Sequence, residues 1–199
     1  MPKVLKIGLT GGLGSGKTFI SKIFVTLGIP IFYADDISKN IISSDPSASQ
    51  EIRLAFGEGV FDASGMLNRR ALANLVFNDP FQLQRLNAIL HPKVFKAFEN
   101  WSSAQVAPYI IKEAAILFES GSYKGLDHVI TVSSPMELRL RRVQERDNCS
   151  KEEFMARVSK QLNEEERIQR ADFVIYNDED RMLIPQVYAL HEKLSLIHA

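Results

Sequence analysis

A glycine-rich segment near the amino terminus restricts the fold of this chain more than any other feature. Residues 11–18 read GGLGSGKT and match the pattern G-x-x-x-x-G-K-[S/T] at every fixed position. The apolar run at 4–10 before it is typical of a buried parallel strand. Apolar residues at helical spacing after it predict a helix over 18–27, ended by Gly28. This order of strand, loop and helix is the context that the pattern requires, so we predict a phosphate-binding loop.

The residue types in this loop explain how it would hold phosphate. Glycines lack Cβ atoms, so successive amides can point inward, and the start of the helix adds its positive dipole end. Lys17 can reach the β- and γ-phosphates, and the Thr18 hydroxyl suits Mg²⁺, which prefers oxygen ligands. A plain glycine-rich turn would leave the Gly-Lys-Thr order unexplained. We expect Thr18 to bind the metal, and the residues expected to bind the nucleotide are Gly12, Leu13, Gly14, Ser15, Gly16, Lys17, Thr18 and Phe19.

Composition and charge exclude several other kinds of protein. Lys+Arg and Asp+Glu are equal at 24 each, so the chain has no basic excess to attract nucleic acid. Its longest strongly apolar segment, 109–118, is well below the roughly 18 apolar residues of a membrane helix. The single cysteine, Cys149, cannot form an internal disulfide, which is consistent with a reducing compartment. We expect a cytoplasmic protein, and the sequence implies no nucleic acid, membrane or protein partner.

Five short apolar segments predict the strands of one sheet. They alternate with segments of helical periodicity, which is typical of an α/β fold with a parallel sheet and helices on both faces. The predicted strands are 4–10, 29–35, 108–114, 126–134 and 171–177.

Two insertions interrupt the predicted core, which comprises 1–36, 106–137 and 171–199. The first, 37–105, has helical periodicity at 68–77 and 79–90. The latter segment is expected to begin with Asp79 as its cap and Pro80 at the first helical position. The second, 138–170, is rich in charges of both signs and contains two possible capping boxes, Ser150 with Glu153 and Asn163 with Glu166. We expect both insertions to be helical.

An acidic pair, Asp35 and Asp36, follows the second predicted strand. In an open parallel sheet, ligands lie at the carboxyl ends of the strands, so one carboxylate can face the phosphate held by the loop. There it could accept the proton of an attacking hydroxyl, because positioning dominates in a loose phosphoryl-transfer transition state. Asp35 could equally cap a helix that begins near Ile37. Spacing alone leaves both interpretations open.

Seven segments spread over nearly the whole chain are diagnostic when taken together. They read IGLTGGLGSGKTFISKIFVTLGIPIFYAD, GMLNRRALANLVF, LNAILHPKV, ILFESG, RRVQERD, ARVSKQ and ADFVIYN. In this combination the chain resembles the dephospho-coenzyme A kinase family. The resemblance implies a P-loop kinase core joined to a helical acceptor domain at 37–105 and a lid at 138–170. It also implies transfer of the γ-phosphate of ATP, with Mg²⁺, to the ribose 3′-hydroxyl of dephospho-CoA, the last step of coenzyme A synthesis.

The resemblance implies roles for single residues that act on the phosphates. Asp35 matches the family's catalytic aspartate, and we place Lys17 and Arg142 beside it as the catalytic set. Arg142 and Arg146 match lid arginines that would close over the phosphates, neutralise charge and exclude water. Each arginine could instead lie on a solvated helix face.

Two further residues match positions in the acceptor domain. Arg69 and His91 could contact the phosphate or ribose of the acceptor. Arg69 could instead pair with a surface carboxylate, and His91 could cap the helix after Pro92.

The chain departs from the family pattern at three places. Tyr33 replaces the first aspartate of Asp-Ala-Asp, Glu113 stands where the third strand usually has aspartate, and Ala115 replaces a proline. These changes affect the expected geometry near Mg²⁺ without altering the interpretation as a kinase. Glu119 and Gln161 match family motifs, but the sequence assigns neither a role.

Two other classes of protein would share part of this sequence pattern. Another small-molecule kinase, acting on a nucleoside monophosphate or a shikimate-like acceptor, would share the core and lid but would not explain the segments of the first insertion. A GTPase switch is suggested by the D-x-x-G pattern at Asp62–Gly65, yet the sequence contains no N-K-x-D guanine reader. We therefore expect Asp62–Gly65 to be a plain turn.

Overall fold

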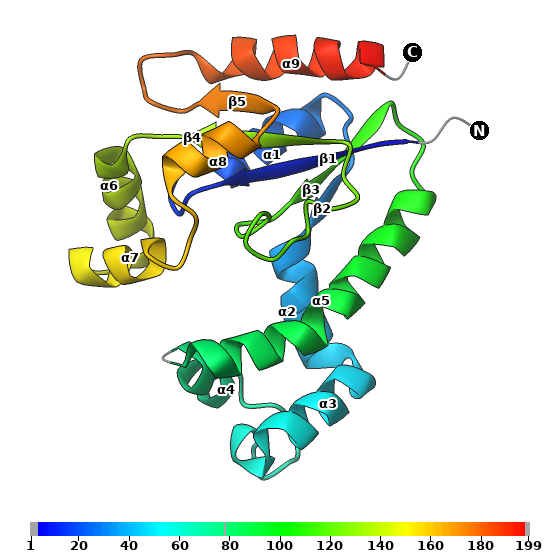
Figure 1. The fold of residues 1–199 in the computed structure, drawn as a ribbon, viewed down its shortest axis with the longest axis vertical. Helices are drawn as coiled ribbons and strands as arrows, with labels where there is room; N and C mark the ends of the chain where they lie inside the picture. Colours follow the sequence, from blue (N-terminus) through cyan, green and yellow to red (C-terminus); the bar gives the residue numbers. More distant parts are fainter. Residues whose placement is uncertain (1–3, 78, 198–199) are drawn as a thin grey trace. The chain divides into compact units, whose positions relative to one another are not determined.

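The computed structural model describes residues 4–77 and 79–197, and the chain divides into two compact units (Figure 1). One unit contains the sheet and comprises Met1–Tyr33 and Trp101–Ala199, whereas the other is helical and comprises Ala34–Asn100. Residues 138–170 lie within the first unit. In the part of the chain that the structure describes, no helix combines the length and apolar character needed to cross a membrane.

Strand β1 (Leu5–Gly11) is the centre of the sheet. β3 (Tyr109–Glu113) and β4 (His128–Ser133) flank it, and β2 (Ile31–Tyr33) and β5 (Phe173–Tyr176) form the edges. Across the described residues the order is β2-β3-β1-β4-β5, and every neighbouring pair is parallel. This confirms the predicted α/β fold with a five-stranded parallel sheet.

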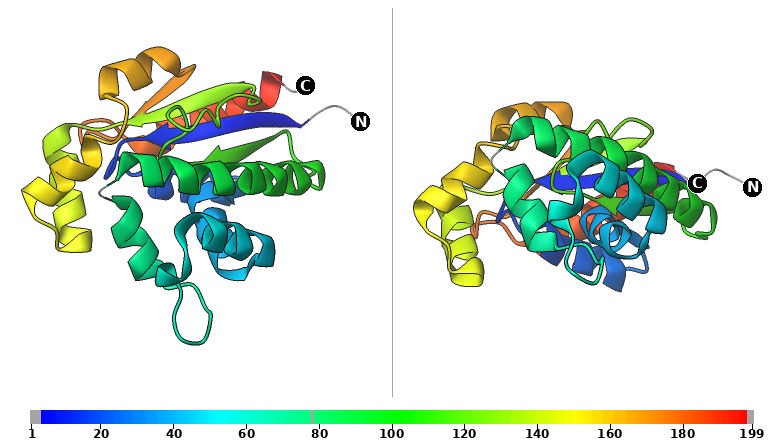
Figure 2. Two further views of the ribbon diagram at one scale, coloured as in Figure 1. Left: turned by 60° about the horizontal axis from the view of Figure 1, so that its bottom comes forward. Right: turned by 90° about the horizontal axis from the view of Figure 1, so that it is seen from below.

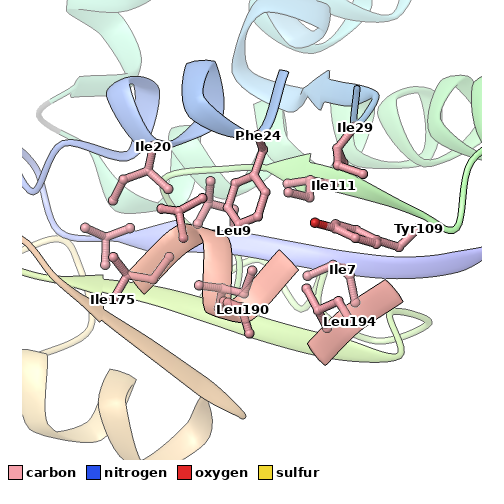
Figure 3. Close-up of a cluster of buried hydrophobic side chains, with 13 residues drawn as sticks. Ile7, Leu9, Ile20, Phe24, Ile29, Tyr109, Ile111, Ile175, Leu190 and Leu194 are labelled. Carbon is pink, nitrogen blue, oxygen red and sulfur yellow. The ribbon is translucent and has the colours of Figure 1, made fainter. Parts of the chain in front are cut away.

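Helices α1 (Lys17–Thr26) and α9 (Leu183–Ile197) pack against one face of the sheet. Phe24 of α1 and Leu190 of α9 share a buried cluster with Leu9 of β1 and with aliphatic residues of the other strands (Figure 3). β1 and α1 are the two elements that flank the glycine loop. Because both are anchored in one apolar core, the ends of the loop are held in place.

Helix α8 (Glu164–Arg170) lies on the opposite face of the sheet. Val132 of β4 belongs to the buried cluster under α1 and α9. The next residue, Ser133, must point the other way because side chains alternate across a strand. Its hydroxyl donates to the Glu164 carboxylate at 2.5 Å. Helices therefore cover both faces, as predicted.

Helices α6 (Met136–Asp147) and α7 (Lys151–Val158) follow β4 and lie side by side (Figure 2). The predicted capping box is present at the start of α7: the Glu153 N–H donates to the Ser150 hydroxyl, and the Ser150 N–H donates to the Glu153 carboxylate. Asn163 caps α8 by accepting from the Glu166 N–H at 2.8 Å. These local signals explain why most of 138–170 is helical.

The helical unit has its own apolar core. The unit begins with α2 (Ala34–Ser44) and α3 (Pro46–Phe56) and continues through a 3-10 turn at Glu58–Val60. It then contains α4 (Arg69–Phe77) and ends within α5 (Pro80–Ser103). One cluster of its buried aliphatic residues comprises Ile52, Val60, Leu72, Val76, Leu86 and Leu90. The predicted cap at Asp79 is confirmed, because its carboxylate accepts from the Phe81 N–H at 2.9 Å.

The boundary between β2 and α2 differs from the prediction. β2 ends at Tyr33 instead of residue 35, and α2 begins at Ala34 instead of near Ile37. Asp35 and Asp36 therefore lie in the first turn of a helix. Acidic side chains are favourable there because they face the positive end of the helix dipole.

The end of α5 also differs from the prediction. The helix continues through Pro92 to Ser103 instead of ending at residue 90. Proline inside a helix removes one backbone hydrogen bond, which usually ends or kinks the helix. Val94 and Phe98, beyond the proline, are buried. The tertiary packing of these side chains outweighs the local cost.

The D-x-x-G segment at Asp62–Gly65 is a turn, as predicted. The Asp62 carboxylate accepts from the Ser64 N–H at 2.9 Å, and the Gly65 N–H donates to the Asp62 carbonyl at 2.9 Å. The side chain of Asp62 is thus used to hold its own turn.

Candidate active site

The carboxyl ends of three strands are aligned beside the glycine loop. Leu9 of β1 is opposite Glu113, the last residue of β3, and Glu113 is opposite Tyr33, the last residue of β2. β1 then continues to Gly11, where the loop leaves the sheet. Two positions at which the chain departs from the family pattern, Tyr33 and Glu113, are therefore neighbours. Glu113 is 7% exposed, so it places a buried carboxyl group at this edge.

The Lys17 side chain folds back over the first residue of the loop, Gly11. The Lys17 ammonium group donates to the Gly11 carbonyl at 2.8 Å, so the side chain folds back across the loop. The first residues of α1 leave Thr18 and Phe19 exposed. A cation, the amino-terminal end of a helix and an accessible hydroxyl are thereby gathered at one edge of the sheet. This is the arrangement that binds phosphate.

Three side chains from distant parts of the chain bind the backbone of the loop. Arg139 donates to the Leu13 carbonyl at 2.9 Å, and the Gln161 side-chain oxygen accepts from the Leu13 N–H at 2.8 Å. The Asn177 amide donates to the Ser15 carbonyl at 2.8 Å. The sequence motifs assign no role to Gln161 and do not single out Arg139 or Asn177. The one available signal was that Asn177 closes ADFVIYN, a segment that carries the family resemblance.

Gly14 lets α6 approach the loop closely. Its φ of 79° lies in the left-handed region, and a Cβ atom there would be 2.6 Å from the Arg139 carbonyl oxygen and 2.8 Å from Cγ2 of Val143. We predict that Gly14→Ala lowers the free energy of unfolding by about 2–5 kcal/mol, the combined cost of left-handed strain and overpacking. Urea unfolding followed by circular dichroism would measure the loss.

Gly28→Ala is the matched control for this substitution. Gly28 has a φ of 80°, and within the described residues a Cβ atom there would have no neighbour closer than 4 Å. This variant should lose only the left-handed strain, about 1–2 kcal/mol. Equal losses in the two variants would contradict the close approach of α6 to Gly14.

Arg142 is connected to the loop through Asn177. Its guanidinium group donates to the Asn177 side-chain oxygen at 3.4 Å and to the Ser134 hydroxyl at 3.1 Å, and it pairs with Glu179 at 3.2 Å. The same Asn177 amide group binds Ser15 of the loop. The structure thus places Arg142, a predicted site residue, near the loop, and the Asn177 side chain lies between them.

Arg146 lies in an ion-pair network at the end of α6. It donates to the Asp147 carboxylate at 2.7 and 2.9 Å, and Arg157 of α7 donates to the same carboxylate at 2.9 Å. Arg146 and Arg157 together hold the pKa of Asp147 well below its usual range. The described hydrogen bonds of Arg146 are with Asp147 and not with the loop.

Asp35, Arg69 and His91 belong to the helical unit. Asp35 is the second residue of α2, so the alternative that it caps a helix starting near Ile37 is wrong. Arg69 opens α4 and donates to the Ser43 hydroxyl of α2, and its described partner is therefore not a carboxylate. His91 lies inside α5, which continues past it, so His91 does not cap a helix.

The oxygen donors of the sheet unit fit a magnesium ion. Thr18 offers an exposed hydroxyl at the start of α1, and Glu113 offers a carboxylate at the end of β3. Mg²⁺ takes hard oxygen ligands and is usually held by one or two protein oxygens together with phosphates and water. Among the described residues, no three His, Cys, Asp or Glu side chains form a group that could hold a metal.

The strand–loop–helix unit at the carboxyl edge of a parallel sheet defines a P-loop protein, a class in which loop amides and a lysine hold a nucleotide. A sequence model of the dephospho-CoA kinase family matches residues 5–182, a span that includes the loop, the helical unit and the 138–170 segment. The chain belongs to the dephospho-CoA kinase family, and it is therefore a kinase.

Known proteins are similar to this chain over nearly its full length. A dephospho-CoA kinase of Bacteroides fragilis strain YCH46 is 41% identical over 187 residues, covering 94% of this chain and 91% of the relative. The crystal structure of TT1252 from Thermus thermophilus is 34% identical, with a TM-score of 0.84 and 98% of both chains covered. A dephospho-CoA kinase from Campylobacter jejuni, 22% identical, shares the fold with a TM-score of 0.61 and coverage of 96% and 97%.

Proposed function

We propose that this chain transfers the γ-phosphate of ATP to the ribose 3′-hydroxyl of dephospho-CoA and so forms coenzyme A. The observation that carries the proposal is the family match over 5–182. This span includes the helical unit as well as the glycine loop, and that unit is the part in which this family differs from other P-loop kinases. The match therefore bears on the acceptor as well as on the nucleotide.

In this proposal the loop binds the triphosphate and neutralises its charge. The amides at the start of α1 bind phosphate oxygens, and Lys17, now held by the Gly11 carbonyl, donates to the β- and γ-phosphates. Mg²⁺, when bound, would supply positive charge that stabilises the negative charge developing on the phosphates. Thr18 would hold it, with Glu113 as a second oxygen donor. Arg142 and Arg146 would add positive charge around the phosphates, and 138–170 would act as a lid that excludes water.

Asp35 would orient the acceptor hydroxyl and accept its proton. One residue, Ala34, separates it from the end of β2, and β2 belongs to the row of strand ends beside the loop. A carboxylate is a weak base, but in a loose transition state the proton leaves late and alignment contributes most. Arg69 and His91 would bind the phosphate or ribose of the acceptor from the helical unit.

The acceptor can be tested directly. With ATP and Mg²⁺ present, turnover on dephospho-CoA should exceed turnover on AMP, CMP and shikimate by roughly a hundredfold or more in kcat/KM, because a site built for polar groups rejects acceptors that leave those groups unpaired. A coupled assay of ADP release would measure the rates. Turnover on one of the rivals without turnover on dephospho-CoA would refute the proposal. The phosphorus NMR spectrum of the product should show a new phosphomonoester on the ribose.

A further inference from the structure

Leu13, the third residue of the glycine loop, is bound through both of its backbone groups. Its N–H donates to the side-chain oxygen of Gln161 at 2.8 Å, and its carbonyl accepts from Nε of Arg139 at 2.9 Å. Arg139 comes from α6, and Gln161 comes from the segment between α7 and α8. One residue of the loop is therefore held from two sides by the 138–170 segment.

Both of these side chains are anchored at their other ends. The Gln161 amide donates to the Ala115 carbonyl, just beyond β3, at 3.3 Å. Arg139 donates to Glu164 at 3.1 Å, and the same Glu164 carboxylate accepts from the Ser134 N–H, at the end of β4, at 3.1 Å. The contacts to Leu13 are thus tied to the ends of the two strands that flank β1. An anchored donor or acceptor fixes its partner better than a mobile one does.

The burial of Arg139 shows how closely it fits the loop. The side chain is 2% exposed, and a Cβ atom at Gly12 would lie 2.4 Å from the Arg139 guanidinium carbon. Burial lowers the pKa of the Arg139 guanidinium group, and Glu164 opposes that shift. A buried charge is costly unless it is paired and hydrogen-bonded. Here the paired charge lies against Gly12 and Leu13 of the loop, and among the described residues its Nη2 atom has no hydrogen-bond partner.

We propose that Arg139 and Gln161 are positioning residues, which hold Leu13 so that the following loop amides are fixed for the phosphates of ATP. Neither residue needs to touch the nucleotide. Their effect is to remove backbone freedom before binding, so that less entropy is lost when ATP binds. The inference rests on the proposed function only in taking ATP as the nucleotide.

Gln161→Met tests the proposal because methionine has a similar length but no amide. Loss of this hydrogen bond should weaken ATP binding by roughly three- to tenfold, measured by isothermal titration calorimetry. The KM for ATP should rise by a similar factor, whereas the KM for dephospho-CoA should not change. Arg139→Met should weaken ATP binding in the same way, and Arg139→Lys, which keeps the charge and one donor, should restore part of the affinity.

Gln186→Met is the matched control. Like Gln161, the Gln186 side chain accepts from one backbone N–H and donates to one backbone carbonyl. Both of these groups belong to Tyr176, at 2.9 and 3.0 Å, and Tyr176 is not in the loop. This variant should lower the melting temperature as much as Gln161→Met does while leaving ATP affinity within twofold. A purely structural role for Gln161 predicts the opposite pattern, with fewer active molecules and unchanged ATP affinity.

The test of the positioning role can be separated from the test of the proposed acceptor. Calorimetry with ATP alone uses no acceptor, so it tests the positioning role even if dephospho-CoA proves to be the wrong acceptor. Unchanged ATP affinity in folded Gln161→Met and Arg139→Met would overturn the inference. Weakened ATP affinity in the Gln186 control, equal to that of the two loop variants, would overturn it as well.

Discussion

Asp35→Asn should lower kcat by at least about a hundredfold, the usual scale for loss of a general base. Asparagine has the same size as aspartate and keeps one side-chain oxygen, but it cannot accept the proton of the acceptor hydroxyl. Binding of ATP should be unchanged, because the loop, Lys17 and Thr18 remain intact. Single-turnover kinetics with ATP and dephospho-CoA, together with calorimetry of ATP binding, would separate the two effects.

Asp36→Asn provides the control for this experiment. Asp36 is also exposed in the first turn of α2, and its carboxylate pairs with Lys39 at 2.9 Å. Both substitutions remove one negative charge from the same helix end, so any effect through the helix dipole should be similar in both. Only Asp35→Asn should abolish turnover. Near-normal kcat in that variant would restrict Asp35 to a structural role in α2.

The sheet and the loop were predictable because their signals are local. An apolar run followed by a fixed glycine pattern and a helical spacing describes β1, the loop and α1 within a few tens of residues. The remaining strands are short apolar segments with clear ends. The end of α5 was missed because a proline usually ends or kinks a helix. Leu90, Val94 and Phe98 continue the apolar four-residue spacing across Pro92, and all three are buried in the structure.

Residues of the candidate site could be predicted from the sequence only where they belong to a recognised motif. The loop residues follow from the pattern, whereas Arg139 and Gln161 lie 126 and 148 residues away from Leu13, which they bind. In the sequence, Arg139 is one of several arginines in a charged segment, and such residues are usually on the surface. Arg139 contacts Leu13 only because the fold brings α6 against the loop. A local sequence pattern could therefore not distinguish this arginine from the others.

Lys17→Met should reduce kcat by about a hundred- to a thousandfold, the effect expected when a donor to developing charge is removed. Unlike Asp35→Asn, it should also weaken ATP binding by roughly tenfold or more, because charge-assisted hydrogen bonds to phosphate are lost. The difference is expected because Lys17 would bind the nucleotide in both the ground state and the transition state. Calorimetry and single-turnover rates would measure the two losses.

Lys22→Met is the control for this variant, because Lys22 is an exposed lysine of the same helix. Both substitutions remove one positive charge from α1, so a general electrostatic effect on ATP would appear in both variants and would decrease with added salt. A local effect would appear in Lys17→Met alone, since only the Lys17 ammonium group reaches back to the Gly11 carbonyl at the start of the loop. If ATP bound equally well to Lys17→Met and to Lys22→Met, the loop amides alone would hold the nucleotide, and Lys17 would have to act only on the transition state.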